Sequence, residues 1–435
     1  MQIQAHIENQ ANKDDCNNIS DFGAFGIGTG LGNCSNLKSL TLNLIGNKIN
    51  AQGATNLGKG LGKCIQLQHL EINLKQNTIG DLGATGLVDG FKTCTNLTIL
   101  NLFLKDNKIL AQGAIGIGEG LGKCKELQSL NVNLCTNNIS YQGASSLCSG
   151  FKFLKNIQIL KIGLCNNNIS TGATNMGNQI KNCSTLQEFQ MYLCNNDIGD
   201  QGFSGLAEGI SSCRNLQTLT LGLWMNNITD HGATTFGSRI AKCSLLQNLT
   251  LILNNNSIGD LGTSNLVFGL QKCQQIQTFK LGLQWGSISN SGVAALAQSL
   301  SYFQNITNLQ FEFNKNQINA LGIQNLGEGL KKCKSLQYLS LNLNDNQIFD
   351  EGITYLCKGL QECQELKRLM IDLSGENQIG NIGVSAITMM MSKLKNLIFL
   401  QLDLKGNKGI NYCDKVKLIR KSRKAARSVY CKIEA

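Results

Sequence analysis

Residues 34–63 read CSNLKSLTLNLIGNKINAQGATNLGKGLGK, and this stretch recurs along the whole chain with small changes. Its leucines at Leu40 and Leu42 alternate with polar residues, which places them on one face of a β-strand. Further on, Leu57 and Leu61 are four residues apart, the spacing of one helix face. The stretch therefore predicts a unit built of a strand, a turn, a helix and a return segment.

The period of the repeat is 30 residues. One glycine recurs at this spacing, with one step of 29 and one of 31: Gly23, Gly53, Gly83, Gly113, Gly143, Gly172, Gly202, Gly232, Gly262, Gly292, Gly322, Gly352 and Gly383. An asparagine recurs in the same way: Asn17, Asn47, Asn77, Asn107, Asn137, Asn167, Asn196, Asn226, Asn256, Asn316, Asn346, Asn377 and Asn407. The series is broken once, at Gly286, directly after Trp285. We expect each Asn to satisfy buried backbone groups of the turn, and each Gly to allow a positive φ or a close backbone approach.

The unit resembles the leucine-rich repeat in its long, ribonuclease-inhibitor-like subtype. The family pattern L-x-x-L-x-L-x-x-N-x-L is matched from Leu37 to Ile49, with an extra strand pair, ending at Leu44, before Asn47. The Asn- and Gln-rich composition is similar to the variant found in ciliated protists. The resemblance implies an α/β solenoid, a horseshoe of about 13–14 repeats. Parallel strands would line the concave face and helices the convex face, and the extra pair would make the strands longer than usual.

The repeat also sets the expected domain organisation. A lone 30-residue unit cannot bury enough apolar surface to fold, so the units must stack as one array. We expect a polar N-terminal lead over 1–16, the array over 17–410, and a basic capping helix with a closing strand over 411–435. Residues 17–33 would supply a half unit without its strand.

The capping helix is expected from Asp414 to Ser428, with Val416, Ile419 and Ala426 facing inward. The closing strand would carry Val429, Cys431 and Ile433.

Composition narrows the class of protein further. Only 15% of residues are charged, proline is absent, and the net charge is +11, of which the last 25 residues hold +6. Residues 1–18 contain no apolar run that would serve as a signal peptide. No stretch reaches the ~20 apolar residues of a membrane span. We expect a cytoplasmic protein, with cytoskeletal or ciliary association left open.

Ten cysteines occupy one repeat position: Cys34, Cys64, Cys94, Cys124, Cys183, Cys213, Cys243, Cys273, Cys333 and Cys363. Other units hold Leu154, Phe303 or Leu394 there, so the position is hydrophobic. We expect these cysteines to be buried thiols, as suits a reducing compartment.

Three more cysteines, Cys135, Cys165 and Cys194, share a different position in adjacent units, just past the strand. The outer two would be nearly 10 Å apart, because neighbouring strands lie ~4.8 Å apart. Zinc-bound sulfurs lie within ~4 Å of one another. We therefore rank a metal or redox role below simple surface variation. His69 and Glu71 share one strand face but have no nucleophile or oxyanion donors to work with.

The concave face is expected to be mostly neutral and polar. Five large side chains enter it within four consecutive units: Tyr192, Trp224, Met225, Ile252 and Trp285. Exposed Trp and Tyr on such a surface are the usual hot-spot types. We interpret the five as a partner-binding site; the alternative is that they pack on one another at the rim.

Gly286 suggests a reason for the break in the asparagine series. It would give up a stabilising side chain and provide Trp285 with a flexible pivot. Alternatively, Ser287 or a water replaces the Asn, and the Trp is incidental.

The basic C-terminal helix allows two interpretations, and its candidate contact residues are Arg420, Lys421, Arg423, Lys424 and Arg427. A capping helix needs a polar outer face, so the charge can be structural. The other interpretation is an electrostatic contact with an acidic partner, such as tubulin-like tails, membrane phosphates or RNA. The helix lacks interleaved aromatics, so sequence-specific nucleic-acid binding is not expected.

The sequence thus predicts a non-enzymatic scaffold that binds a partner protein on the concave face, with no cofactor and no metal. Two alternatives remain. One is a structural subunit of a cytoskeletal or ciliary assembly. The other is a contact-type regulator of a small GTPase, since Ran GTPase-activating proteins share the fold; their tail is acidic, whereas this one is basic.

Overall fold

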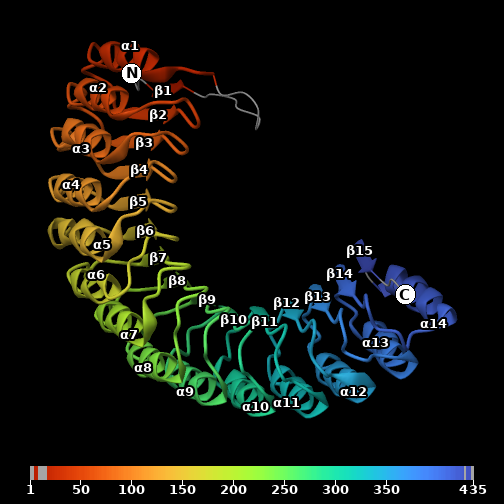
Figure 1. The fold of residues 1–435 in the computed structure, drawn as a ribbon. Helices are drawn as coiled ribbons and strands as arrows, with labels where there is room; N and C mark the ends of the chain where they lie inside the picture. Colours follow the sequence, from red (N-terminus) through yellow and green to blue (C-terminus); the bar gives the residue numbers. More distant parts are fainter. Residues whose placement is uncertain (1–3, 8–16, 426–427, 433–435) are drawn as a thin grey trace. The chain divides into compact units, whose positions relative to one another are not determined.

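The computed structural model describes residues 4–7, 17–425 and 428–432, with side chains from residue 17 to residue 421. The chain divides into two compact units, Met1–Leu221 and Gly222–Ala435. Within each unit, strands and helices alternate along the chain, and the helices stack along one side of the strands (Figure 1).

The first unit begins with a short strand and continues with regular repeats. Its strands are β1 Gln4–Ile7, β2 Ser39–Asn43, β3 His69–Asn73, β4 Ile99–Phe103, β5 Ser129–Asn133, β6 Ile159–Gly163 and β7 Glu188–Tyr192, followed by β8 Thr218–Gly222, whose last residue opens the second unit. Its helices are α1 Ser20–Leu31, α2 Ala51–Leu61, α3 Gly80–Phe91, α4 Ala111–Leu121, α5 Ser140–Ser149, the 3-10 helix Gly150–Phe153, α6 Gly172–Ile180 and α7 Gly199–Ile210.

The second unit repeats the same plan. Its strands are β9 Asn248–Ile252, β10 Thr278–Gly282, β11 Asn308–Glu312, β12 Tyr338–Asn342, β13 Arg368–Asp372, β14 Phe399–Asp403 and β15 Ser428–Lys432. Its helices are α8 Asp230–Ile240, α9 Asp260–Leu270, α10 Asn290–Ser299, the 3-10 helix Leu300–Tyr302, α11 Ala320–Leu330, α12 Phe349–Leu360, α13 Asn381–Lys393 and α14 Tyr412–Ala425.

All pairings described within each unit are parallel, and the spatial order of the strands follows the chain. Residues one period apart are partners, as Leu40 is of Leu70. Alternate strand residues are buried against the helices, and the others lie on the opposite face, here called the open face. The predicted α/β solenoid, with parallel strands on one face and helices on the other, is confirmed within each unit.

Both ends of the array differ in part from expectation. The prediction that the first half unit lacks a strand is wrong, because β1 lies within the polar lead and pairs with β2. The closing strand is confirmed: β15 pairs with β14, with Val429 opposite Leu400 and Cys431 opposite Leu402. Ile433 lies outside the described residues.

The capping helix differs in its bounds from the predicted Asp414–Ser428. It begins at Tyr412 and ends at Ala425, and Ser428 already belongs to β15. Leu418 is its fully buried residue, while Val416 and Ile419 are half-buried. The sequence did not single out Leu418, because a helix of this charge is compatible with several rotations about its axis. Ala426 lies outside the described residues.

The recurrent asparagines form a ladder between successive turns. The Asn77 Oδ1 atom accepts hydrogen bonds from the backbone N–H groups of Asn47, at 3.0 Å, and Ile49, at 2.9 Å. Its Nδ2 atom donates to the carbonyl oxygens of Leu44 and Leu74, both at 2.9 Å. One buried amide thus serves four backbone groups in two repeats, as the sequence predicted.

A second ladder links several helix starts and accounts for the recurrent glycine in those repeats. The Asp81 Oδ1 atom accepts from the N–H groups of Leu110, at 2.7 Å, and Gly113, at 2.8 Å. A Cβ atom on Gly113 would lie 2.6 Å from that oxygen. Gly113 lies inside α4, so the close approach, and not a positive φ, requires glycine. Asp230, Asn290 and Asp350 act in the same way in the second unit.

Glycines also set how closely the helices stack. A Cβ atom on Gly60 in α2 would collide with the backbone of Gly28 in α1. One period earlier, Gly30 in α1 has no heavy atom within 4 Å of its Cβ position. These helices have weak intrinsic helix propensity because of their glycines. Their stability therefore comes from packing against neighbours.

This pair of equivalent glycines gives a matched test of helix stacking. We expect Gly60→Ala to lower the free energy of unfolding by about 1–3 kcal/mol, because a backbone clash cannot be relieved by a rotamer change. Gly30→Ala should raise it by about 0.5–1 kcal/mol, since alanine is the better helix former and meets no obstacle. Urea unfolding followed by circular dichroism measures both; equal effects would contradict the role given to close packing.

Candidate functional site

The turns that follow the strands present large side chains to solvent. Trp224 is 43% exposed, Met225 40%, Trp285 53% and Tyr192 39%. Ile252 is half-buried on the open face of β9. The structure therefore places all five predicted contact residues at the surface.

Four of the five belong to the second unit and lie on three successive repeats. The Leu223 N–H donates to the Ile252 carbonyl at 2.8 Å, so the Trp224 turn runs beside the end of β9. In the following repeat, the Asn255 N–H donates to the carbonyl of Gln284, the residue before Trp285. Strands lie ~4.8 Å apart, so the two tryptophan turns are separated by roughly 10 Å.

A polar network begins between these two turns, at Asn254, and continues to Glu312 at the end of β11. Asn254 is 7% exposed; its Oδ1 atom accepts from the Gln284 N–H at 3.0 Å, and its Nδ2 atom donates to Glu312 at 3.1 Å. Glu312 also forms an ion pair with Lys280 at 2.6 Å. Asn254 fits here because Gly282 has no side chain: a Cβ atom there would lie 2.5 Å from its Oδ1 atom. The two tryptophan turns therefore lie along a hydrogen-bonded polar floor formed by Asn254, Lys280 and Glu312.

Trp285 is held by its own backbone and by a lysine of the next repeat. Its φ of +55° is in the left-handed region, as for Met225, Asn255 and Lys315 at equivalent turn positions. The Lys315 ammonium lies 3.8 Å from the centre of the Trp285 ring. Such an exposed cation–π contact contributes about 0.5–1 kcal/mol.

Gly286 leaves one step of the asparagine ladder empty. In the preceding step, Asn256 Oδ1 accepts from the N–H groups of Asn226 and Ile228, both at 3.0 Å. Gly286 offers no such acceptor to Asn256 and Ile258. The φ of Gly286 is not in the left-handed region, so its backbone does not require glycine. The pivot assigned to it stays a prediction.

Tyr192 belongs to the first unit, at the end of β7. It pairs in register with Gly163 of β6, and its carbonyl accepts from the Leu164 N–H at 2.8 Å. Gly163 has no side chain, so the Tyr192 ring has a glycine as its neighbour on the open face. The first unit therefore presents Tyr192 at the end of a strand, apart from the exposed aromatics of its helices and connecting segments, such as Tyr141 and Phe153.

The cysteines of the recurrent slot are buried thiols, with one exception. Nine of the ten are buried, and burial raises the pKa of Cys94 to about 11 and that of Cys124 to about 12. Cys34 is exposed, so the prediction is wrong for this residue. The reason lies in the stacking: the Cys64 thiol donates to Leu31 O of the preceding repeat at 3.3 Å, whereas Cys34 bonds only to Gly30 O of its own repeat, at 3.5 Å.

Cys135, Cys165 and Cys194 lie side by side and half-buried at the edge of the open face. The Cys165 N–H donates to the Cys135 sulfur at 3.2 Å. Cys194 adjoins Cys165 in the next repeat, where its carbonyl accepts from the Asn166 N–H at 2.9 Å. The three thus form a contiguous row of thiols, which the sequence placed correctly and the structure now connects.

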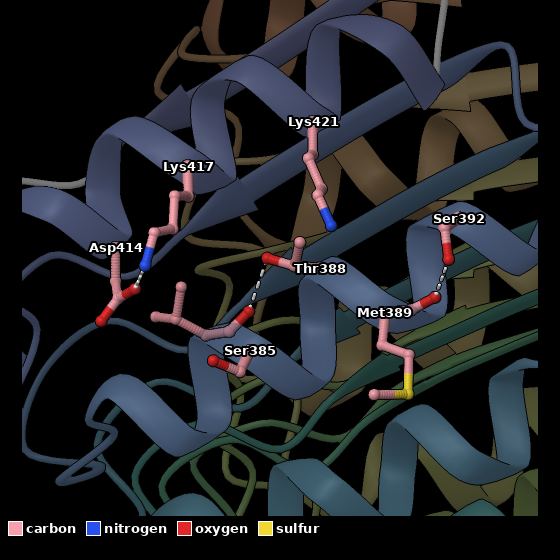
Figure 2. A pocket seen from close by; sticks show the side chains of 8 residues that line it. Ser385, Thr388, Met389, Ser392, Asp414, Lys417 and Lys421 are labelled. Carbon is pink, nitrogen blue, oxygen red and sulfur yellow. Dashed lines mark hydrogen bonds and ion pairs between the residues drawn. The ribbon is translucent and has the colours of Figure 1, made fainter.

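The basic helix α14 packs against α13, and its exposed lysines include two at the edge of this contact. The Lys417 ammonium pairs with Asp414 at 3.1 Å. Lys421 points from α14 toward Thr388 of α13, across a hollow of about 250 Å³ that both helices line (Figure 2). Arg420 is exposed.

The structure does not describe the side chains of the other predicted contact residues of this helix. Arg423 and Lys424 belong to α14, but their side chains lie outside the described part. Arg427 lies outside the described residues altogether.

Other candidate chemistry finds no support in the geometry. Glu71 accepts a hydrogen bond from Asn101 at 2.9 Å. His69 lies exposed at the start of β3. Across the described side chains, no group of three or more His, Cys, Asp or Glu is arranged to hold a metal ion. Among the described helices, none is both long and apolar enough to cross a membrane.

Comparisons with known proteins give structural likeness only. No protein-family model matches the chain, and no curated protein matches it in sequence. An internalin from Listeria monocytogenes superposes with a TM-score of 0.45 at 17% identity, covering 82% of this chain and 95% of the internalin. A chain in the octameric complex of Latrophilin 3, Unc5D and FLRT2, whose FLRT2 part is described as leucine-rich repeat, gives 0.45 at 16%, covering 79% and 86%.

Sequence reasoning missed Lys315, which contacts Trp285, and the polar floor of Asn254, Lys280 and Glu312. A signal was available for Asn254, because it stands one period after Trp224. It was also available for the aspartate ladder, whose members recur near the helix starts. The Lys315 contact with Trp285 depends on side-chain direction, which a repeat pattern does not indicate.

The empty ladder step predicts a stabilising substitution. We expect Gly286→Asn to raise the free energy of unfolding by about 1–3 kcal/mol, because buried backbone N–H groups gain an acceptor. The new Cβ atom would lie 3.1 Å from Leu283 O and 3.2 Å from Asn316 Oδ1, so the Asn316 side chain must shift slightly.

The control for this substitution is Asn256→Gly, which should destabilise by a similar amount. Urea titration of both variants provides the measurement. A Gly286→Asn protein no more stable than the parent would show that the ladder does not need this step. If the variant keeps full partner binding, the pivot hypothesis for Trp285 is wrong.

Proposed function

We propose that this protein is a non-catalytic scaffold of the ribonuclease-inhibitor-like leucine-rich repeat subtype, and that it binds a partner protein on the open face of its sheet. The observation that carries the proposal is the pair of exposed tryptophans, Trp224 and Trp285, which lie along a hydrogen-bonded polar floor in the second unit. Ile252 and Met225 complete this surface. Tyr192 is a separate contact point of the first unit.

The physical argument rests on what such a surface offers. Tryptophan supplies large contact area with few rotatable bonds, and it is enriched at the centres of protein interfaces. The Asn254–Glu312–Lys280 network is already hydrogen-bonded, so it need not reorganise when a partner arrives. The surface is pre-organised in its floor and apolar at its two edges.

The partner's chemistry follows from the groups that face it. An apolar side chain of the partner would sit between the two tryptophans. Lys315 has its ammonium above the Trp285 ring. A carboxylate on the partner would pair with this ammonium, and the tryptophan would exclude water from the pair. We therefore propose a protein segment that carries an apolar residue next to an acidic one.

Helix α14 supports a second candidate contact. Arg420 and Lys421 are exposed near the C-terminal end of the chain, where the net charge is concentrated. An acidic partner would be attracted here, and the attraction would weaken with salt. Arg423, Lys424 and Arg427 belong to this proposal on sequence grounds alone.

We also propose a cytoplasmic location. The two alternative roles, assembly subunit and GTPase regulator, can be distinguished by identifying the partner. A permanent subunit would be recovered in fixed stoichiometry with its assembly. A regulator would bind one small GTPase and change its rate of hydrolysis.

The test uses substitutions that the repeat itself supplies. Trp224→Asn and Trp285→Asn install the residues found one period away, at Asn254 and Asn255. Asparagine tolerates the left-handed φ of position 285 better than tryptophan, and at position 224 it is the residue that the next repeat holds, so the double variant should fold. The control is Phe268→Ala, because Phe268 is an exposed aromatic on α9, away from the open face.

The tagged full chain and these variants are used to recover partners from the native cell, with washes at ~0.1 M and ~1 M salt, where the Debye length falls from ~10 to ~3 Å. We expect a partner that stays bound at high salt. Its affinity should fall at least ~30-fold in the double variant, as for a hot spot of ≥2 kcal/mol. The Phe268→Ala protein should retain it. A double variant that keeps every partner would overturn the proposal; partners lost at high salt and in Arg420→Ala/Lys421→Ala would favour α14.

A further inference from the structure

Five equivalent positions of consecutive repeats form a row along the edge of the open face in the first unit. The residue two places after the strand is Lys75 after β3, Lys105 after β4, Cys135 after β5, Cys165 after β6 and Cys194 after β7. Two lysines therefore adjoin three thiols in consecutive repeats. Electropositive and partly exposed surroundings of this kind distinguish reactive cysteines from inert buried ones.

The backbone bonds show that the repeats carrying the thiols are direct neighbours. The Thr136 N–H donates to the Cys165 carbonyl at 2.8 Å, and the Asn166 N–H donates to the Cys194 carbonyl at 2.9 Å. Neighbouring strands are ~4.8 Å apart, within the 4.4–6.8 Å between Cα atoms that a disulfide needs. Cys135 and Cys194 are two strands apart, at roughly 10 Å, and are too distant to be bridged.

The environment makes the first thiol of the row a nucleophile. Hydrogen bonds from the thiol and the N–H of Cys165, together with the charge of Lys105, lower the pKa of Cys135 to about 7 despite its partial burial. The hydrogen bonds to Cys135 and Cys194 raise the pKa of Cys165, which keeps its proton and stays a donor. Cys135 is thus the thiolate and Cys165 the neighbouring thiol.

We propose that Cys135 and Cys165 form a reversible thiol–disulfide site, in which Cys135 reacts with a hydroperoxide and Cys165 resolves the product. The Cys135 thiolate attacks the outer oxygen of the hydroperoxide. The O–O bond breaks, the alkoxide or hydroxide leaves and takes a proton from water, and Cys135 becomes a sulfenic acid. The Cys165 sulfur then attacks the Cys135 sulfur and displaces hydroxide, which leaves as water with the Cys165 proton.

The two steps balance as one hydroperoxide and two thiols giving one alcohol or water, one further water and one disulfide. A low-molecular-weight thiol of the glutathione class reverses the change by thiol–disulfide exchange, itself becoming oxidised. Cys194 can exchange with the Cys165 half of the disulfide but cannot reach Cys135. The middle cysteine is therefore the one that every disulfide in this row must contain.

The first experiment measures the pH dependence of alkylation on the full-length protein. Iodoacetamide labelling of each cysteine is followed by mass spectrometry, with the exposed Cys34 and Cys413 as internal comparators. We expect the Cys135 rate to reach half its plateau near pH 7. For equal access, a thiol ionised to about one half at that pH reacts roughly threefold faster than an ordinary exposed thiol, after the lower nucleophilicity of a weaker base is allowed for.

The matched variants separate hydrogen bonding from simple exposure. Cys165→Ala removes the thiol donor but keeps the backbone N–H, so the half-plateau pH of Cys135 should rise. Cys165→Ser restores a donor and should bring it back toward that of the parent. A half-plateau pH for Cys135 equal to that of Cys34 and Cys413, unmoved by Cys165→Ala, would overturn the assignment of Cys135 as the nucleophile.

The second experiment identifies the product of oxidation. After treatment with hydrogen peroxide and tryptic digestion without reductant, Cys165 lies alone on peptide 162–181, and Cys135 on peptide 126–152. We expect these peptides to be cross-linked in the parent and in Cys194→Ser. In Cys135→Ser the cross-link should be lost, which excludes Cys148 as the partner within peptide 126–152. In Cys165→Ser, Cys135 should be trapped as a sulfenic acid by dimedone.

Peroxide that modifies Cys34 and Cys413 before Cys135, with no cross-linked product, would overturn the proposal.

Discussion

The bond on which the structure depends is the one between an asparagine side chain and the backbone of the preceding turn. Each turn leaves N–H and carbonyl groups buried between repeats, and an unmet group of this kind costs about 1–3 kcal/mol. The side chain of Asn77 satisfies four such groups at once, two as acceptor and two as donor. Because the groups belong to different repeats, the same side chain closes one turn and fixes the position of the next.

The helix side of the repeat depends on a different constraint. Glycines there leave room for atoms of the neighbouring repeat, because they have no side chain. Gly113 admits the carboxylate of Asp81, and Gly60 admits the backbone of α1. Between them, the asparagine and the glycines fix both edges of each repeat without using the residues that face solvent. The turn positions after the strands are therefore free to vary, and this freedom is where tryptophans and thiols occur.

The sequence was sufficient for everything that repeats. The strands, the helices, the buried leucines and the bonding role of the asparagines all follow from period and residue type. It was insufficient where a residue departs from its period or where a neighbour is missing. Cys34 obeys the pattern but lacks a preceding repeat to cover it, and β1 lies in a segment with no repeat signal at all. The contact of Lys315 with Trp285 and the hydrogen bond between Cys165 and Cys135 join adjacent repeats through side-chain direction, which a linear pattern does not contain.

The buried cysteine slot has a consequence for how this molecule can be observed. Most repeats hold one thiol there, and burial keeps the pKa of those at Cys94, Cys124, Cys273 and Cys333 well above neutral. Such a thiol is silent toward alkylating reagents until its own repeat opens. In a linear array each repeat depends mainly on its neighbours, so opening proceeds from place to place along the chain. The order in which the thiols become reactive would thus report the order in which the repeats unfold, at a resolution of one repeat.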